Sequence, residues 1–205
     1  FIIDSTAPVA AASMEGIAGA SGWYVSPVDV TLLSTDTLSG VKMTGYRVEG
    51  AGYGNEEILY TSSFTLSNEW LYSLRYYTVD NAGNIEQEKS VNVNIDLSTP
   101  GINAAATPAA NAYGWNNIQV SLVFTGTDAV SGIVYCTPDK VIDVEGSSRT
   151  VSGYCMDYAG WSSTTAYSVS IDTTPPLLAY TRTPPNAAGW NNSDVSVGFE
   201  CSDGL

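Results

Sequence analysis

One hexapeptide is present three times in this chain and constrains its fold more than any other feature. The copies span Ile3–Pro8, Ile95–Pro100 and Ile171–Pro176, and each is followed about nineteen residues later by a Gly-Trp pair. The tryptophans of these pairs stand roughly 90 and 75 residues apart. Such a spacing is too long for a helical or leucine-rich solenoid unit and suits a small β-sandwich domain. We therefore interpret the hexapeptide as the boundary between tandem domains.

The boundaries predict four segments. Residues 1–4 end a preceding repeat and its linker, 5–96 and 97–172 are two domains, and 173–205 begin a third. The first residues resemble the strand ends that precede the later boundaries, and the last residues stop at a turn where the second repeat continues. The chain is thus expected to begin and end within a repeat.

Short runs that alternate apolar and polar residues fill each repeat, with Gly, Asn and Asp turns between them. Examples are Val28–Leu33, Leu71–Val79 and Ser90–Ile95 in the first repeat, and Ile118–Phe124, Ile133–Cys136 and Val151–Met156 in the second. Alternation of this kind indicates strands with one buried face, and about seven of them per repeat predict a sandwich. No window shows a 3.6-residue apolar period, so the predicted class is all-β, with short Pro-containing linkers between the sandwiches.

The charge balance excludes several classes of partner and of site. Seven Lys and Arg against 21 Asp and Glu leave a net charge of −14, whereas nucleic acid and anionic membranes need a basic surface. No apolar run approaches the length of a membrane span, so direct membrane insertion is not expected. The chain has no histidine, which removes the commonest general base and the usual zinc ligand.

The set of motifs resembles a known group of proteins. Ile-Asp-Thr-Thr-Pro-Pro, Gly-Trp-Asn-Asn, Asp-x-x-Ser-Gly and Val-Asp-Asn-Ala-Gly-Asn together are similar to the tandem immunoglobulin-like repeats of large bacterial and archaeal surface proteins. Adhesin stalks, S-layers and sheaths contain such repeats, so the resemblance implies an extracellular, cell-surface location. It covers nearly the whole chain. The departures are Trp161 where the first repeat has Asn84, and Gly126 where the third has Cys201.

Carboxylates are expected to gather where each repeat begins. In an immunoglobulin-like sandwich the two turns that carry them lie at the end where the chain enters. The predicted sets are Asp4 with Asp36 and Asp80, Asp96 with Asp128 and Asp157, and Asp172 with Asp203. Oxygen ligands of this kind suit Ca²⁺, and related stalks use junctional Ca²⁺ to stiffen their linkers, as the resemblance implies. The alternative is that each Asp only caps the backbone of its own turn.

The chain has three cysteines, and the resemblance bears on how they pair. In related repeats a cysteine at the place of Cys201 pairs with one after the Ser-Gly-Ile turn, a partner that would lie beyond Leu205. Since Gly126 stands there in the second repeat, we expect Cys136 to pair with Cys155 on the neighbouring strand. Such a disulfide would indicate an oxidising exterior. Two buried free thiols are the alternative.

Aromatic residues and one sequon are the remaining candidates for binding. The Gly-Trp tryptophans, with the tyrosines of the first repeat, could stack on sugars, but their recurrence favours packing at one end of each sandwich. The loop from Gly50 to Gly54, with Tyr53, is the candidate binding tip. Asn191 begins an Asn-Asn-Ser sequon for N-linked glycan.

These patterns lead to a functional hypothesis. No nucleophile elbow, phosphate loop or Cys-His pair is present, and the chain is predicted not to be an enzyme. We expect a structural spacer or polymer segment of an extracellular filament, S-layer, sheath or adhesin stalk, whose partners are copies of itself or neighbouring repeats. A glycan-binding or adhesin module is the alternative. A further option is assembly of chains by strand exchange through residues 173–205.

Overall fold

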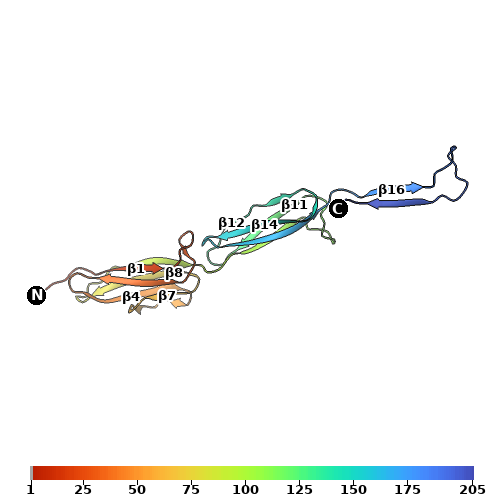
Figure 1. The fold of residues 1–205 in the computed structure, drawn as a ribbon. Helices are drawn as coiled ribbons and strands as arrows, with labels where there is room; N and C mark the ends of the chain where they lie inside the picture. The colour runs from red at the N-terminus through yellow and green to blue at the C-terminus, as the bar shows by residue number, and fades with distance from the viewer. Residues whose placement is uncertain (1) are drawn as a thin grey trace. The chain divides into compact units, whose positions relative to one another are not determined.

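The computed structural model describes residues 2–205, and in this range the chain forms strands connected by turns and loops. Within the same range no helix has the length and apolarity needed to cross a membrane. The predicted all-β class is therefore confirmed. Figure 1 shows two groups of sheets followed by a separate hairpin.

The first group is a sandwich of two sheets. One sheet has the order β1-β3-β7, formed by Val9–Glu15, Val28–Thr35 and Phe64–Leu66. The other has the order β2-β9-β8-β4-β5, formed by Trp23–Tyr24, Lys89–Ile95, Trp70–Asp80, Val41–Gly50 and Tyr53–Gly54. β6, Ile58–Leu59, pairs with β4 outside this order.

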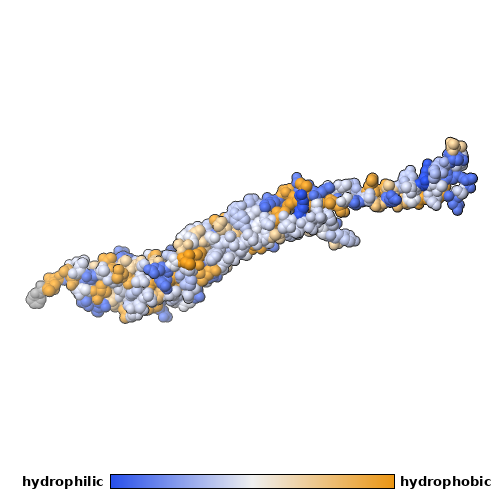
Figure 2. Space-filling view, viewed as in Figure 1, coloured by the Kyte–Doolittle hydropathy of each residue, from blue (hydrophilic) through white to orange (hydrophobic). Residues whose placement is uncertain are grey.

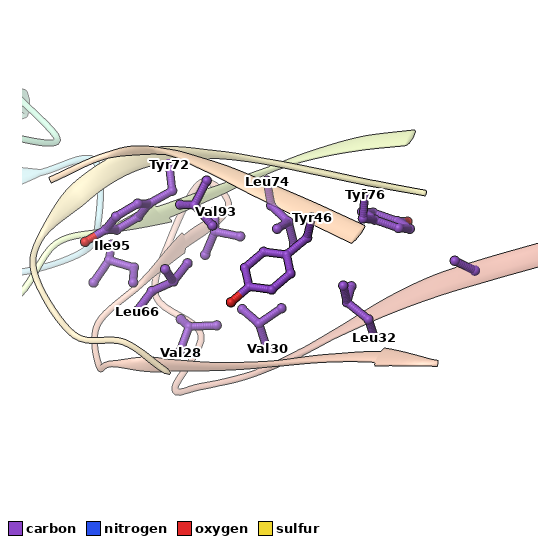
Figure 3. Packing of buried hydrophobic residues seen from close by; sticks show 12 residues of the cluster. Val28, Val30, Leu32, Tyr46, Leu66, Tyr72, Leu74, Tyr76, Val93 and Ile95 are labelled. Atoms are coloured by element: carbon purple, nitrogen blue, oxygen red, sulfur yellow. The ribbon is translucent and has the colours of Figure 1, made fainter. Parts of the chain in front are cut away.

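Alternation along the strands builds the core of this sandwich. In β3 the buried side chains are Val28, Val30 and Leu32, and the residues between them face solvent. Figure 3 shows these three side chains directed toward the aromatic and aliphatic residues of the opposite sheet. Tyr46 stacks on Phe64 with ring centroids 4.5 Å apart, which places tyrosine rings inside the core.

The second group also has two sheets. β10 (Gly101–Thr107), β11 (Val120–Thr127) and β13 (Lys140–Ile142) form one in the order β10-β11-β13. β12 (Ile133–Cys136), β14 (Gly146–Asp157) and β15 (Ser162–Ile171) form the other in the order β12-β14-β15. Val120, Leu122 and Phe124 alternate as buried residues of β11, as the pattern Ile118–Phe124 predicts.

The last two strands pair only with each other. β16 (Leu177–Arg182) and β17 (Val197–Ser202) form an antiparallel hairpin in which every strand residue is exposed. The alternation of the sequence predicts a strand over Val195–Phe199, and in the structure β17 begins at Val197 and ends at Ser202. No opposing sheet covers the apolar side chains of this hairpin within residues 2–205.

Two strands at the start of the repeats were not predicted from the pattern. β1 and β10 contain Ala-rich sequences, Val-Ala-Ala-Ala-Ser-Met-Glu and Gly-Ile-Asn-Ala-Ala-Ala-Thr, and alanine has low strand propensity. β1 forms nonetheless because it pairs along its length with β3, from Val9 opposite Thr35 to Glu15 opposite Asp29. Tertiary pairing overrides local propensity here.

By compactness the chain divides into two units. The first comprises residues 2–103, Thr125–Thr137 and Tyr154–Thr164, and the second comprises Ala104–Phe124, Pro138–Gly153 and Thr165–Leu205. Strand pairing, in contrast, stays within the predicted segments 5–96, 97–172 and 173–205. The domain boundaries at Asp96 and Asp172 remain predictions. Two sets of aspartates lie wholly inside the first unit, namely Asp4, Asp36 and Asp80, and Asp96, Asp128 and Asp157.

Candidate functional site at the start of each sandwich

The Asp-x-x-Ser-Gly turns hold Asp36 and Asp128 by local hydrogen bonds. The Asp36 Oδ2 atom accepts from the Leu38 and Gly40 N–H groups at 3.1 and 2.7 Å. The Asp128 Oδ1 atom accepts from the Val130 and Gly132 N–H groups at the same two distances. The glycines adopt φ values of 79° and 78°, a conformation that other residues rarely take. The turn sequence therefore determines where each carboxylate lies.

A second turn follows the long strand of each sandwich and holds Asp80 and Asp157. Asp80 ends β8, and its Oδ1 accepts from the Asn84 N–H at 2.8 Å. Asp157 ends β14, and its Oδ1 accepts from the N–H groups of Gly160 and Trp161 at 2.8 and 2.9 Å. Both carboxylates are fully buried, with 0% and 1% of their surface exposed.

The hexapeptide supplies the third carboxylate in the same manner at each copy. Asp4, Asp96 and Asp172 each accept, through Oδ1, the N–H of the residue two positions on, at 3.0, 3.1 and 3.0 Å. Capping of the local backbone is thus present at all three copies, as the alternative interpretation expects.

The three carboxylates of the first two sets converge. One oxygen each from Asp4, Asp36 and Asp80 lies within 4.8 Å of the others, and the same holds for Asp96, Asp128 and Asp157. We call these sets the first and second triads. This convergence follows the expectation from the loop positions. Asp172 and Asp203 line a common hollow with Glu145 in the second compact unit, but they form no such triad within residues 2–205.

The side chain that lies beside each triad is different in the two repeats. In the first triad the Asn84 side-chain amide donates to Asp80 Oδ2 at 2.8 Å and to the Asp4 carbonyl at 3.2 Å. In the second, Trp161 occupies the place of Asn84, and its Nε1–H donates to the Asp96 carbonyl at 3.2 Å. The indole thus replaces one of the two amide hydrogen bonds. The Oδ2 atoms of Asp96 and Asp157 are buried and have no hydrogen-bond partner within residues 2–205.

Asp80 and Asp157 hold equivalent positions, but their pKa values are shifted in opposite directions. Burial alone would raise the pKa of Asp80, but the hydrogen bonds from Asn84 bring this pKa below its ordinary value. Burial raises the pKa of Asp157, the charges of Asp96 and Asp128 raise it further, and the N–H groups of Trp161 and Gly160 offset this only in part. The pKa of Asp4 is lowered, mainly by the Thr6 N–H. Hydrogen bonds within the protein therefore favour the charged form of Asp80 in the first triad. The charged form of Asp157 in the second triad is disfavoured.

The Asp96 backbone connects both sides of its junction. Its N–H donates to the Tyr24 carbonyl of β2 at 2.9 Å, and its carbonyl accepts from Trp161 in the second group of sheets. Close by, the Ala20 N–H donates to the Ala159 carbonyl at 2.8 Å. A Cβ on Gly19 would lie 2.5 Å from that carbonyl oxygen, so only glycine permits this approach.

Two glutamates near the linkers were missed in the sequence. Glu69 precedes β8 and accepts the Leu97 N–H at 3.2 Å. Glu145 precedes β14 and accepts the N–H of Thr173 at 2.8 Å, together with the hydroxyls of Thr173 and Thr174. These hydrogen bonds, led by the Thr173 hydroxyl, lower the pKa of Glu145. The sequence offered one signal for these two residues, because both glutamates stand just before the long strand of their repeat.

Cys136 pairs with Cys155, the partner expected for it on the neighbouring strand. Cys136 and Cys155 face each other on β12 and β14 and form a disulfide, with Cα atoms 4.1 Å apart. A Cβ on Gly126 would lie 2.9 and 3.0 Å from the two sulfur atoms, so the bridge occupies the space beside this glycine. Cys201 is an exposed free thiol.

The aromatic residues considered for sugar binding differ in how far they are buried. Trp23 is buried, Trp115 is half-buried and Trp190 is 75% exposed, so the packing expected for all three tryptophans is wrong for Trp190. The hairpin β16–β17 offers no second sheet on which that ring could pack. Tyr72 and Tyr76 are core residues, and Tyr53, in the candidate binding loop, packs edge-on against Tyr72 with centroids 6.1 Å apart.

Asn191 lies in the second compact unit and is half-buried. Its Nδ2 atom, to which a glycan would be attached, is 3.5 Å from the Thr183 carbonyl, and its Oδ1 is enclosed. Asn116, at the same place in the Gly-Trp-Asn-Asn motif, is 8% exposed, and its amide nitrogen can face the Pro108 and Ala109 carbonyls. This position is engaged in turn packing in both copies, and glycosylation of Asn191 remains a prediction.

No protein-family model matches the chain, and no curated protein does so either. Among solved structures the chain is similar to the fibronectin(III)-like modules of Clostridium thermocellum CbhA. The match has a TM-score of 0.34 and 13% sequence identity over 78% of this chain and 93% of that chain. A TM-score this low does not establish a common fold. The β-sandwich fold is established instead by the strands and sheets of this chain itself.

Proposed function

We propose that this chain is a rigid spacer segment of an extracellular surface protein or filament, with copies of itself or neighbouring repeats as its partners. The observation that carries the proposal is the hydrogen bonding of Asp96. This linker residue donates from its N–H to Tyr24 on one side and accepts at its carbonyl from Trp161 on the other. A flexible linker would leave both groups to water. Here the residue is fully buried, with 0% of its surface exposed.

Other features of the chain support the same role. Pro100 and Pro176 follow the boundary residues, and proline fixes φ and keeps the preceding residue extended. The Cys136–Cys155 disulfide favours an oxidising exterior. On the face seen in Figure 2, apolar groups are scattered among hydrophilic ones. A net charge of −14 would keep long arrays soluble.

We do not assign a catalytic role to the carboxylates of the two triads. The sequence has no histidine, and the carboxylates of both triads are engaged by the N–H groups of their own turns. A general acid or base needs access to a substrate proton. Fully buried carboxylates at a junction, such as Asp80 and Asp96, lack that access.

A distance measurement across the junction tests the spacer. Spin labels attached without cysteine chemistry at the exposed positions Thr31 (β3) and Thr164 (β15) would report the width of the distance distribution by pulsed electron paramagnetic resonance. The wild-type distribution should be narrow. Trp161→Phe keeps an aromatic ring at this position but removes the Nε1–H donor to the Asp96 carbonyl, so the distribution should broaden.

Two reference variants make this result decisive. Trp70→Phe changes an exposed tryptophan elsewhere in the first sandwich and should leave the width unchanged. Insertion of Gly-Gly-Ser-Gly after Leu97 gives the width of a flexible linker. A wild-type distribution as broad as that of the insertion variant would rule out the spacer.

One observation favours a glycan-binding module as the second candidate. A shallow groove beside Gly50 is lined by Trp70, Asn92 and Asn94, and Trp70 is 50% exposed. An exposed indole beside amide side chains suits a sugar ring. Specific signals on a glycan array that disappear in Trp70→Ala would support this function. The spacer is preferred because the tyrosines of the first repeat, apart from Tyr77, lie in or against the core.

A further inference from the structure

One long strand of the second sandwich has a free edge. β15 ends the order β12-β14-β15, and with ten residues it is the longest edge strand among residues 2–205. Its last residues are covered by Asn116, which forms a parallel bridge with Ile171. The Asn116 N–H donates to the Ser170 carbonyl at 3.0 Å, and the Asn116 carbonyl accepts the Asp172 N–H at 2.9 Å. Before Ser170, β15 has no neighbouring strand on this side within the described part of the chain.

The two hydrogen bonds of Asn116 show which backbone groups face the free edge. In a β-strand the N–H and C=O groups of one residue point to the same side, and those of the next residue point to the other side. Because Ser170 and Asp172 point toward Asn116, the residues at even positions before them point the same way. These residues are Ser162, Thr164, Ala166 and Ser168. Such a row of unpaired backbone groups is a template for pairing with another strand.

The first sandwich protects the corresponding side with two charged side chains. Glu86 accepts the Ala10 N–H of β1 with both carboxylate oxygens, at 3.0 and 3.1 Å, and Lys89 donates to the Ala10 carbonyl at 2.6 Å. Glu86 and Lys89 also form an ion pair at 2.7 Å. The polar backbone groups of Ala10 are therefore used within the chain, and charges at such a place oppose pairing with another chain.

The second sandwich lacks these charges. When β9 and β15 are aligned at their last residues, Lys89 corresponds to Thr165 and Glu86 corresponds to Ser162. β15 contains no charged residue, although the net charge of the chain is −14. Its threonine, tyrosine, valine and isoleucine residues favour the extended conformation. An uncharged edge is the part of an acidic chain that a second acidic chain can approach with least repulsion.

We propose that β15 pairs antiparallel with β15 of a second copy of the chain and joins the two copies side by side. The pair has two-fold symmetry, so the same surface serves both copies. An uncharged strand has no charge with which to attract a basic or acidic partner, but its own copy matches it in length and in lack of charge. The inference rests on the proposed spacer function only for its purpose, which is the lateral association of spacers.

One register uses every outward-pointing residue of the free edge. With the two-fold axis at Thr165, Ser162 lies opposite Ser168 of the other copy. Thr164 lies opposite Ala166 of the other copy, and all of these are hydrogen-bonded pairs. Thr165 then lies opposite Thr165 of the other copy in a non-hydrogen-bonded pair, where side chains are closer. Cross-strand threonine pairs are stabilising.

Analytical ultracentrifugation tests the pairing. At about 0.15 M NaCl, which screens part of the repulsion between the copies, the wild type should dimerise reversibly between about 10 μM and about 1 mM, as weak interfaces do. Thr165→Lys introduces the lysine of the first sandwich and should weaken dimerisation about tenfold or more, because lysine would face lysine. Thr31→Lys makes the same change at an exposed position of the central strand β3 and should leave dimerisation unchanged.

Two results would overturn the inference. One is a chain that stays monomeric at about 1 mM, and the other is a dimer that Thr165→Lys does not weaken. The Thr165→Lys variant should fold, because Thr165 and Lys89 are both half-buried and the first sandwich accommodates the lysine. Circular dichroism checks this for both lysine variants.

Disulfide cross-linking tests the register independently. Non-hydrogen-bonded antiparallel pairs bring two Cα atoms to about 4.5 Å, a distance that a disulfide can span. In a Cys201→Ser background, Thr165→Cys should therefore give a covalent dimer under mild oxidation, seen on a non-reducing denaturing gel. Ser163→Cys would lie opposite Tyr167 of the other copy and should stay monomeric. Equal cross-linking of the two variants would contradict the proposed pairing.

The lateral contact and the spacer can fail separately. A monomeric chain with a narrow distance distribution across the junction removes the contact and leaves the spacer. A dimer that Thr165→Lys dissociates, with a broad distance distribution, does the reverse.

Discussion

At the residue scale, Asn84 and Trp161 occupy the same place in two copies of one turn and provide different donors. Both side chains donate to the carbonyl of the linker aspartate at 3.2 Å, but only the Asn84 side chain also donates to the buried carboxylate beside it. A single side chain therefore determines whether the Oδ2 atom of the buried aspartate after the long strand, Asp80 or Asp157, has a donor within the protein.

Removal of the Asn84 amide should make stability depend differently on pH. The folded-state pKa of Asp80 is below its unfolded value of 3.8, so its stabilising effect is complete above pH 3.8 and is lost as the pH falls toward the folded pKa. Asn84→Ala should lower Tm at pH 7, where Asp80 is charged, and the difference from wild type should shrink at about pH 3.

Asn81→Ala is the control for this measurement. Asn81 lies in the same turn, but its amide donates to the uncharged Ser39 and Gly40 carbonyls. Its effect on Tm should be the same at both pH values. An equal pH dependence of the two variants would contradict the role assigned to Asn84.

Gly153 should tolerate no side chain. It is buried in β14, and a Cβ there would lie 2.5 to 2.6 Å from three ring carbons of Phe124. Gly153→Ala should therefore destabilise the protein by about 1–3 kcal/mol through overpacking. Gly54→Ala, whose Cβ would meet nothing closer than 3.9 Å, should be close to neutral in thermal or chemical unfolding. Equal stability of the two variants would contradict this account.

At the element scale, the disulfide joins the short strand β12 to the long strand β14. β12 has four residues and pairs with β14 across an irregular register, so few hydrogen bonds hold it. The bridge closes a loop with a sequence separation of 19 and restricts the unfolded chain. The bridge therefore anchors a short edge strand to the long strand beside it.

Loss of the bridge should destabilise the second group of sheets. Cys136→Ala with Cys155→Ala should cost about 2–4 kcal/mol, measured by urea unfolding under oxidising conditions. Thiol titration of the denatured, unreduced wild type should give one thiol per chain, from Cys201. Cys201→Ser should leave the stability unchanged and reduce the thiol count to zero. Three thiols in the wild type would exclude the bridge.

At the scale of the whole molecule, acidic charge is in excess. The net charge of −14 on 205 residues opposes compaction through self-repulsion, and dissolved salt screens this repulsion. The ion pairs present, such as Lys89 with Glu86 at 2.7 Å, are too few to balance the carboxylates within residues 2–205. Stability should therefore respond to ionic strength in general.

Monovalent salt should raise Tm. An increase from about 10 mM to about 500 mM NaCl shortens the Debye length from ~30 Å to below 10 Å, so Tm should rise by a few degrees. KCl should act equally, because screening does not depend on which monovalent cation is present. A Tm that fell with salt would show that attractive ion pairs outweigh repulsion in this chain.

The sequence by itself determined the repeat, the all-β class and the positions of the charged turns. These features rest on local chemistry: period-two alternation in runs such as Val28–Leu33, glycines with positive φ at Gly40 and Gly132, and Asp residues that cap their own turns. Because turn geometry is encoded within a few residues, the convergence of Asp96, Asp128 and Asp157 followed from placing known loops at one end of a sandwich.

Only the tertiary structure decided how the junction is held. The Ala-rich strands β1 and β10 form because partners far along the chain pair with them, and no local pattern marks them. The hydrogen bond from Trp161 to the Asp96 carbonyl spans 65 residues, and the approach of Ala159 to Gly19 spans more than twice that. Which oxygens of a triad remain unpaired depends on these long-range contacts, whose distances and directions are set only when the sheets pack.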